Sequence, residues 1–280
     1  MSKIIGAVEI GTSCAKALVG EVTEGKSLNI VGKSVRKNEG MRKGEIVDFR
    51  KVASSVHAAL EEAEKMSGTT VDSVYLAQTG AHIKGSFLRG SANVASPDGR
   101  VSVDDLQTAA NEAKRKQPAS GRSYVHHVRM PIQLDGRSVE DPVGMIGKKV
   151  ELIYWSIEGD ESAIRMNLDL AHNYGLEVAD LILSSIASST MVAGPDLRRA
   201  GVLVIDLGAG VTDLALYRNG NVAYTGVIPV GGDHLTGDLS MGLRVLEPYA
   251  EELKLEYGKA QSDPSDADQQ LWIIGNKTIG

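Results

Sequence analysis

The sequence has little that would suit a secreted, membrane-spanning or nucleic-acid-binding protein. It contains one cysteine, Cys14, so no disulfide can form within the chain, which fits the reducing cytosol. No apolar run approaches the roughly 18 residues that cross a bilayer, and the N-terminal MSKIIGAVEIG is too short and interrupted for a signal peptide. The net charge of -6 argues against nucleic acid as a partner, because proteins that bind it usually carry a basic face. These absences favour a cytoplasmic globular protein.

What the sequence does contain is an alternation of strand-like and helix-like segments, which indicates an α/β fold. The segments 3–10, 15–22 and 27–37 have strand patterns, and 49–66 has apolar residues at helical spacing with one buried stripe. The end of the chain, 263–280, is expected to be a polar loop followed by one apolar strand.

Residues 83–164 are expected to form a compact α+β unit set inside this larger pattern. The stretch begins with small and polar residues, and Ser102 and Asp105 then have the spacing of a capping box. The helix that follows is expected to bury Val103, Leu106, Ala110 and Ala113. Asp135-Gly136 indicates a hairpin. We therefore expect three parts, which are 1–82 together with 165–197, 83–164, and 198–280.

A repeat connects the two ends of the chain. IIGAVEIGTSCAKALVG can be placed over GVLVIDLGAGVTDLALY, and Glu9 then falls on Asp206 and Gly11 on Gly208. The chain twice builds a strand, an acidic residue, a glycine-containing turn and a second strand. For either hairpin alone, a plain hairpin with a turn-capping acid is the alternative. As a matched pair they predict two related lobes that point both acids and both turns into one cleft.

Each predicted turn has the residue types that a phosphate site needs. Glycines let backbone N–H groups approach an anion, and hydroxyls and an ammonium add further donors. The predicted phosphate-binding residues are Gly11, Thr12, Ser13, Lys16, Gly208, Ala209, Gly210 and Thr212. A carboxylate beside a phosphate is repelled unless a cation lies between them. Glu9 and Asp206 are therefore the candidate catalytic residues and the candidate site for Mg²⁺, bound through water.

Two further features have competing interpretations. Gly231, Gly232 and Asp233 precede a helix whose N-terminus could bind a phosphate, and a simple strand-to-helix turn is the alternative. His126 and His127 are adjacent on an alternating strand and point to opposite faces, so they are a poor metal site.

The two hairpin motifs, EIGTSCAKALVG and VIDLGAGVTDLALY, resemble the phosphate motifs of the actin, sugar-kinase and heat-shock-70 ATPase superfamily. Within it, the chain is most similar to the FtsA family of bacterial cell-division proteins. The segments that carry this resemblance are EDPVGMIGKKVEL, LILSSIASST, VIPVGGDHLTGDLSMGL and AEELKLEYG. DPVGM matters most, because it belongs to the inserted unit that this family carries in place of actin's corresponding subdomain. The resemblance covers nearly the whole chain, in order.

The resemblance implies an actin-like (ribonuclease-H-like) two-lobed ATPase fold with an FtsA-type inserted α+β subdomain and an incomplete second lobe. It implies ATP and Mg²⁺ as cofactors, with at most slow ATPase activity. It also implies FtsZ and other division proteins as partners, and self-association into filaments. A full-length form would lie at the inner face of the cell membrane at the division site. Glu251 and Lys254 match family positions near the ribose or base, with a solvated helix face as the alternative.

The sequence departs from the superfamily pattern in several places. Glu9 stands where actins and sugar kinases carry aspartate, although FtsA-type chains accept glutamate, and Ala209 interrupts the usual run of three glycines. The late Gly-Gly motif that holds adenosine and the C-terminal amphipathic helix that binds membrane do not occur in this sequence. Membrane contact is therefore expected only through a C-terminal segment absent here. The chain is either a truncated one or a shortened relative.

Two other functions in the same superfamily remain as alternatives. A pilus-assembly scaffold similar to PilM would bind a short peptide of an inner-membrane partner, and DPVGM argues against it. A sugar or acid kinase would need a substrate base deep in the cleft, and no second carboxylate of the first lobe has a suitable sequence context.

Overall fold

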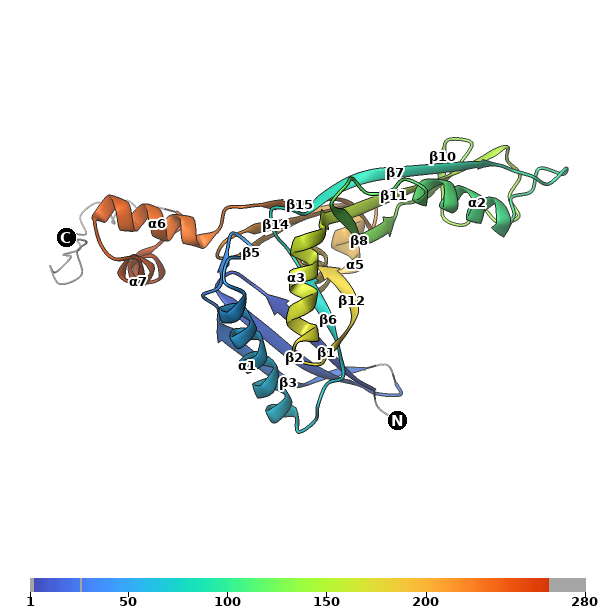
Figure 1. The fold of residues 1–280 in the computed structure, drawn as a ribbon. Helices are drawn as coiled ribbons and strands as arrows, with labels where there is room; N and C mark the ends of the chain where they lie inside the picture. Colours follow the sequence, from blue (N-terminus) through green and yellow to red (C-terminus); the bar gives the residue numbers. More distant parts are fainter. Residues whose placement is uncertain (1–2, 26, 262–280) are drawn as a thin grey trace.

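The computed structural model describes residues 3–25 and 27–261, so the strand predicted within 263–280 lies outside the described residues. Figure 1 shows a central region of sheet and helix, from which one sheet extends to one side and two helices to the other. The first sheet has the strand order β12-β6-β1-β2-β3. Its strands are β1 (Lys3–Ile10), β2 (Cys14–Val22), β3 (Leu28–Lys37), β6 (Ser73–Gln78) and β12 (Glu177–Leu183).

The core of this sheet follows from its alternation. In β1 the residues Gly6, Val8 and Ile10 are buried on one face. Helix α1 (Phe49–Ser67) covers that face with its apolar stripe, as its spacing predicts. Asp48 caps the start of α1 through the N–H groups of the first turn, and Gly68 ends it in a left-handed conformation.

A second sheet extends from this centre and has the order β10-β9-β11-β7, with β8 paired to β11. Its strands are β7 (Lys84–Asn93), β8 (Arg122–Arg129), β9 (Ile132–Leu134), β10 (Arg137–Val139) and β11 (Lys149–Asp160). The predicted hairpin turn at Asp135-Gly136 joins β9 to β10, with both residues at positive φ. Strand β7 lies in the stretch of small and polar residues. A side chain at Gly90 would come within 2.1 Å of the Ala109 carbonyl oxygen, so glycine allows this strand to contact the helix beside it.

That helix, α2 (Val103–Lys114), has the predicted capping box of Ser102 and Asp105. The predicted burial of Val103 is wrong, because its side chain is 66% exposed. The buried face instead follows Asp105, Ala109 and Ala113, while Leu106 and Ala110 are partly buried. The physical reason is the cap itself, since the Asp105 carboxylate turns inward to accept the N–H groups of Ser102 and Ala95.

The third sheet has the order β13-β14-β15, which are Val202–Leu207, Thr212–Arg218 and Asn221–Ile228. A small ribbon pairs β4 (Met41–Arg42) with β5 (Glu45–Ile46). The other helices are α3 (Glu161–His172), α4 (Ser184–Val192), α5 (Pro195–Ala200), α6 (Gly232–Leu243) and α7 (Glu247–Tyr257). Helix α4 is the predicted small-residue helix, and it contacts β6 of the first sheet as well as β13 and β14. No helix in the described part of the chain is both long and apolar enough to cross a membrane.

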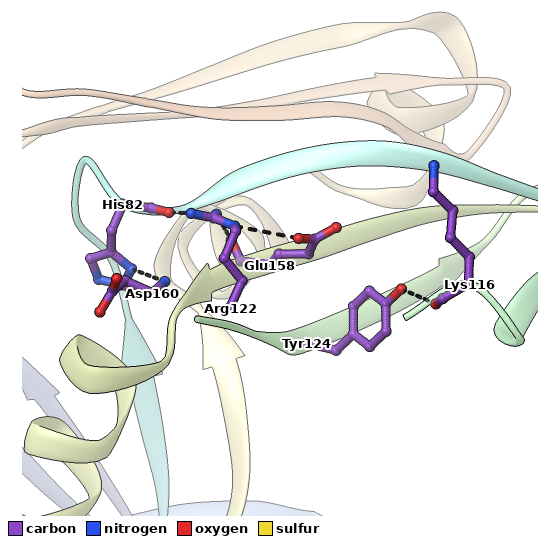
Figure 2. Close-up of polar contacts among 6 residues, drawn as sticks. All are labelled: His82, Lys116, Arg122, Tyr124, Glu158 and Asp160. Atoms are coloured by element: carbon purple, nitrogen blue, oxygen red, sulfur yellow. Dashed lines mark hydrogen bonds and ion pairs between the residues drawn. The ribbon is translucent and has the colours of Figure 1, made fainter. Parts of the chain in front are cut away.

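Polar contacts hold the second sheet where it meets the first (Figure 2). The Arg122 guanidinium donates to the His82 carbonyl oxygen at 2.8 Å and forms an ion pair with Glu158 at 3.3 Å. The ring of His82 accepts the backbone N–H of Asp160 at 3.2 Å, and burial lowers the pKa of His82. Nearby, the Tyr124 hydroxyl donates to the Lys116 carbonyl oxygen at 2.5 Å. These bonds join the start of β7, the start of β8 and the end of β11.

Candidate functional site

The two hairpins of the repeat have the same turn. Gly11 N–H donates to the Cys14 carbonyl oxygen at 3.0 Å, and Gly208 N–H donates to the Val211 carbonyl oxygen at 3.0 Å. In the strands, Glu9 lies opposite Lys16, and Asp206 lies opposite Asp213. The sequence repeat is therefore also a structural repeat. In each hairpin the acid of the first strand pairs with the equivalent residue of the second strand.

The two turns meet each other, as the repeat predicts. A side chain added at Gly210 would lie 2.5 Å from the Thr12 hydroxyl oxygen and 3.0 Å from the backbone nitrogen of Lys43. The same Thr12 oxygen accepts the N–H of Gly44 at 3.1 Å. Lys43 and Gly44 form the positive-φ turn between β4 and β5. A third turn, which the sequence analysis did not assign to the site, thus packs against both hairpin turns.

The first candidate acid, Glu9, is paired with Lys16. The Lys16 ammonium lies 2.8 Å from the Glu9 carboxylate, and both side chains are partly exposed. Partial burial works against the charge of Lys16, but the hydrogen bond and the charge of Glu9 outweigh it and raise the pKa of Lys16. The predicted phosphate donor is therefore engaged by the predicted metal-binding acid of the same hairpin.

The second candidate acid, Asp206, is held by a residue of α4. The Ser188 hydroxyl donates to the Asp206 carboxylate at 2.5 Å. The next residue, Ser189, shares a hydrogen bond of 2.6 Å with the Tyr217 hydroxyl of β14. Two adjacent hydroxyls therefore fasten the small-residue helix to the second hairpin.

The structure adds a third acid that sequence reasoning missed. Asp213 is buried, and the Thr79 hydroxyl lies 2.8 Å from each of its carboxylate oxygens. Burial raises the pKa of Asp213 to about 7, and the charges of Asp206 and Glu9 act in the same direction against the hydrogen bond from Thr79. The available sequence signal was the repeat itself, in which Asp213 falls on Lys16.

This arrangement gathers acids beside the two turns, because the charges of Glu9 and Asp206 both act against that of Asp213. A cation would relieve that repulsion. Among the described residues, no group of three or more histidine, cysteine or acidic side chains is arranged to hold a metal ion.

The N–H groups at the start of α6 already have acceptors. Gly232 N–H donates to the Gly208 carbonyl oxygen at 2.9 Å, and Asp233 N–H donates to the Ala209 carbonyl oxygen at 2.8 Å. Gly231 N–H donates to the ring of His234 at 3.1 Å. In this conformation the segment ties α6 to the second hairpin turn, which favours the strand-to-helix interpretation over a phosphate site.

Further hydrogen bonds near the turns involve the predicted donor Thr212 and the backbone of Ser13 and Gly11. The Thr212 hydroxyl donates to the Val230 carbonyl oxygen at 2.7 Å. Ser13 accepts the N–H of Asn38 on its carbonyl oxygen at 2.8 Å. Asn38 in turn donates its side-chain amide to the Gly11 carbonyl oxygen at 2.9 Å. These bonds fix the backbone of both turns.

Glu251 and Lys254 link the last two helices. The Lys254 ammonium lies 2.6 Å from the Glu251 carboxylate and donates to the Thr236 hydroxyl at 2.9 Å and the Gly232 carbonyl oxygen at 3.3 Å. Burial works against the charge of Glu251, but the hydrogen bonds from Lys254 and Thr236 outweigh it and lower the pKa of Glu251. The Lys254 side chain is 19% exposed, so the alternative of a solvated helix face does not hold for it.

Family models recognise two parts of this chain. Residues 203–279 match the model described as "Cell division protein FtsA". Residues 80–156 match the "SHS2 domain inserted in FTSA". The second match contains most of the second sheet, α2 and the DPVGM segment.

Solved structures with the same fold include the PilM-PilN type IV pilus biogenesis complex. It covers 91% of this chain and 70% of the other, with a TM-score of 0.62 and 19% identity. MreB5 of Spiroplasma citri, solved bound to ADP, covers 94% of this chain and 64% of the other, with a TM-score of 0.50 and 14% identity. These likenesses show an actin-like fold and nothing more specific.

Curated relatives match nearly the whole chain. FtsA of Pseudomonas aeruginosa is 32% identical over 97% of this chain and 65% of the relative. FtsA of Bacillus subtilis is 31% identical over 96% of this chain and 61% of the relative. The chain thus spans roughly two thirds of the length of these proteins. FtsA of Neisseria meningitidis serogroup B is 31% identical over 99% of this chain and 67% of the relative, and this breadth of identity places the chain in the FtsA family of cell-division proteins.

Proposed function

We propose that this chain binds Mg·ATP between its two hairpin turns and serves as an actin-like scaffold in bacterial cell division. Family membership supports the division role. The observation that carries the nucleotide site is the contact of the two equivalent turns at Thr12 and Gly210, beside Asp213 and the two acids, Glu9 and Asp206, whose charges act against its own. Tight glycine turns that expose backbone N–H groups suit phosphates, and a surplus of carboxylates suits a cation.

In this proposal each residue has a role that follows from its chemical groups. The backbone of the turns at Gly11 and Gly208 receives the phosphates, with Thr12 and Lys16 as added donors. Asp206 and Glu9 would hold Mg²⁺ through water. Mg²⁺ supplies positive charge that neutralises the phosphate oxygens.

Nucleotide acts mainly as a conformational ligand in this proposal, and turnover is slow. The hairpins belong to different sheets, so a ligand that touches both favours the arrangement that brings them together. The partners that we infer from the family are FtsZ, other division proteins and further copies of this chain. We also infer from the family that the protein acts at the cytoplasmic face of the division site.

The proposed Mg²⁺ role can be tested with Asp206→Asn. This change keeps the size of the side chain and an oxygen that can accept from Ser188, but it removes the charge. With Mg²⁺ present, ATP affinity should fall by about tenfold, which corresponds to about 1.4 kcal/mol. Without Mg²⁺ it should hold or rise, because carboxylate–phosphate repulsion is relieved.

Calorimetry measures the ATP affinity in both conditions, with and without Mg²⁺. Glu9→Gln should act in the same direction but more weakly, since Glu9 is already neutralised in part by Lys16. Asp196→Asn, on the exposed face of α5, serves as the matched control and should change the affinity in neither condition. Equal effects of Asp206→Asn in both conditions would remove the metal role and leave Asp206 as a residue of the fold.

A further inference from the structure

A cavity lies away from the hairpin turns, where four parts of the fold meet. It has a volume of about 380 Å³ and is bounded by β8, α4, α5 and the turn between β14 and β15. Its lining carries two arginines and two histidines, which are Arg129, Arg198, His126 and His127, and none of the lining residues is acidic. It shares no residue with the candidate nucleotide site. The cavity is therefore a basic site without a counter-charge of its own.

Arg198 has a donor that faces no acceptor. Its Nε atom is buried and has no hydrogen-bond partner among the described residues. The guanidinium lies 5.7 Å from the centre of the Tyr217 ring, and the Arg198 carbonyl oxygen accepts Gly220 N–H at 2.9 Å. The side chain is thus held in place by the hairpin. The Nε atom itself is covered, so a ligand in the cavity would meet the remaining N–H groups of the guanidinium.

The other polar groups show that the charge of the site comes from the arginines. The His127 ring pairs with the Ser156 hydroxyl at 3.0 Å, and burial lowers the pKa of His127. The Tyr217 hydroxyl is taken by Ser189 at 2.6 Å. Arg129, on the facing strand β8, is exposed and has no ion pair within the described residues. Two arginines on different elements therefore line one cavity.

We propose that this cavity binds a phosphate-type oxyanion, with Arg198 and Arg129 as its principal donors. Guanidinium groups bind such oxyanions through paired N–H groups, and an arginine without a carboxylate partner among the described residues is suited to an exogenous anion. One water occupies about 30 Å³ of liquid, so the cavity has room for a phosphate and for the group that carries it. A phosphate monoester fits this space better than the free ion does.

The test is a titration with inorganic phosphate at constant ionic strength, followed through the Arg198 Nε–H signal by NMR. The signal should shift and saturate with phosphate, whereas chloride at the same ionic strength should leave it unchanged. Arg198→Met keeps the aliphatic stem on Tyr217 and should weaken binding at least tenfold, as measured by calorimetry. Arg129→Gln, at an exposed position, should weaken it several-fold. Arg199→Gln, on the same helix but outside the lining, is the matched control.

The probes also identify the source of the anion. Tighter binding of a blocked phosphoserine than of inorganic phosphate supports a phosphate monoester, and the reverse order supports the free ion. Acetate that binds as tightly as phosphate would overturn the proposal, as would a shift that chloride reproduces. Phosphate binding that survives both Arg198→Met and Arg129→Gln would overturn it as well. None of these results depends on ATP binding at the hairpin turns.

Discussion

At the scale of single residues, Asp213 combines burial with two neighbouring acids. Its carboxylate receives one hydrogen-bond donor, the Thr79 hydroxyl, which lies equally close to both oxygens. One hydroxyl can satisfy only part of a buried carboxylate, and Asp206 and Glu9 add repulsion. The result is an acid that binds its proton in the folded state up to about pH 7.

This proton makes the stability of the protein depend on pH. The folded pKa of Asp213 is about 7, against an ordinary value of 3.8, so the folded chain holds a proton that the unfolded chain has lost between these values. The contribution is complete below about pH 3.8 and is lost as the pH rises to about 7. We expect Asp213→Asn to gain stability relative to wild type as the pH goes from 5 to 8, because the asparagine has no proton to lose.

Denaturant unfolding of both proteins at several pH values measures this difference. The exposed Asp169→Asn is the control and should show a constant offset from wild type. A difference for Asp213→Asn that does not change with pH would show that Asp213 is ionised throughout.

Ser188 is a second residue whose role depends on one bond. Its hydroxyl is the donor to Asp206 at 2.5 Å, so Ser188→Ala leaves the carboxylate without that donor. We expect the free energy of unfolding to fall by about 1.5–3 kcal/mol, as for hydrogen bonds to charged groups. Ser188→Thr keeps the hydroxyl and should retain most of the stability in thermal or denaturant unfolding. Equal losses for both variants would assign the effect to packing of α4.

At the scale of elements, the candidate site is formed by turns that pack against one another. There is no room for a side chain between position 210 and Thr12. The turn between β13 and β14 can therefore approach the turn between β1 and β2 only because residue 210 is glycine. The β4–β5 turn joins them through Gly44 and Lys43. The position of one hairpin is thereby set by the other.

A double-mutant cycle tests this contact. Gly210→Ala should destabilise the fold by about 1–3 kcal/mol, because the new methyl group overlaps Thr12. In a Thr12→Ala background most of that penalty should disappear, which gives a favourable coupling free energy. Gly237→Ala, in α6 with open space around it, is the control and should be neutral or stabilising. Additive losses for Gly210→Ala and Thr12→Ala in denaturant unfolding would show that the turns do not touch in solution.

At the scale of the whole molecule, one apolar cluster joins the three sheets, while the first and second sheets each also have a core cluster of their own. A single apolar cluster includes Ile83 and Trp155 of the inserted region, Leu183 of the first sheet, and Ala215 and Tyr217 of the third. Trp155 also donates its indole N–H to the Thr225 hydroxyl of β15 at 2.9 Å, and both side chains are buried. Deleting the inserted region would therefore remove part of the core that supports the second hairpin.

The Trp155–Thr225 bond gives a direct test of this coupling. Thr225→Val preserves the shape but leaves a buried indole N–H without an acceptor, so we expect a loss of about 1–3 kcal/mol in the free energy of unfolding. Thr225→Ser restores the hydroxyl and should recover most of it. In wild type the inserted region and the third sheet should unfold together, as judged by far-UV circular dichroism and tryptophan fluorescence. Separate transitions in wild type would show that the core is not shared.

Features that depend on neighbours in the sequence were predictable from the sequence. The capping box of Ser102 and Asp105 and the turn at Asp135-Gly136 are formed by residues within three positions of each other. The repeat was also visible, because each hairpin is a local structure whose strand, acid and turn follow in order. Burial within α2 was predicted less well, since Val103 fits the helical period but lies at the cap, beyond the neighbouring sheet.

The tertiary structure alone decided how the acids of the site are held. The Thr79 hydroxyl reaches Asp213, and the Ser188 hydroxyl reaches Asp206 from a helix that lies before the hairpin in the chain. Neither partner can be predicted from spacing or periodicity, because the path of the backbone between the two elements decides which hydroxyl lies within hydrogen-bond distance of each acid. The sequence by itself thus determined the two matched hairpins and their acids. The contacts between distant segments determined which acid is buried, which is paired, and which arginine nitrogen has no hydrogen-bond partner among the described residues.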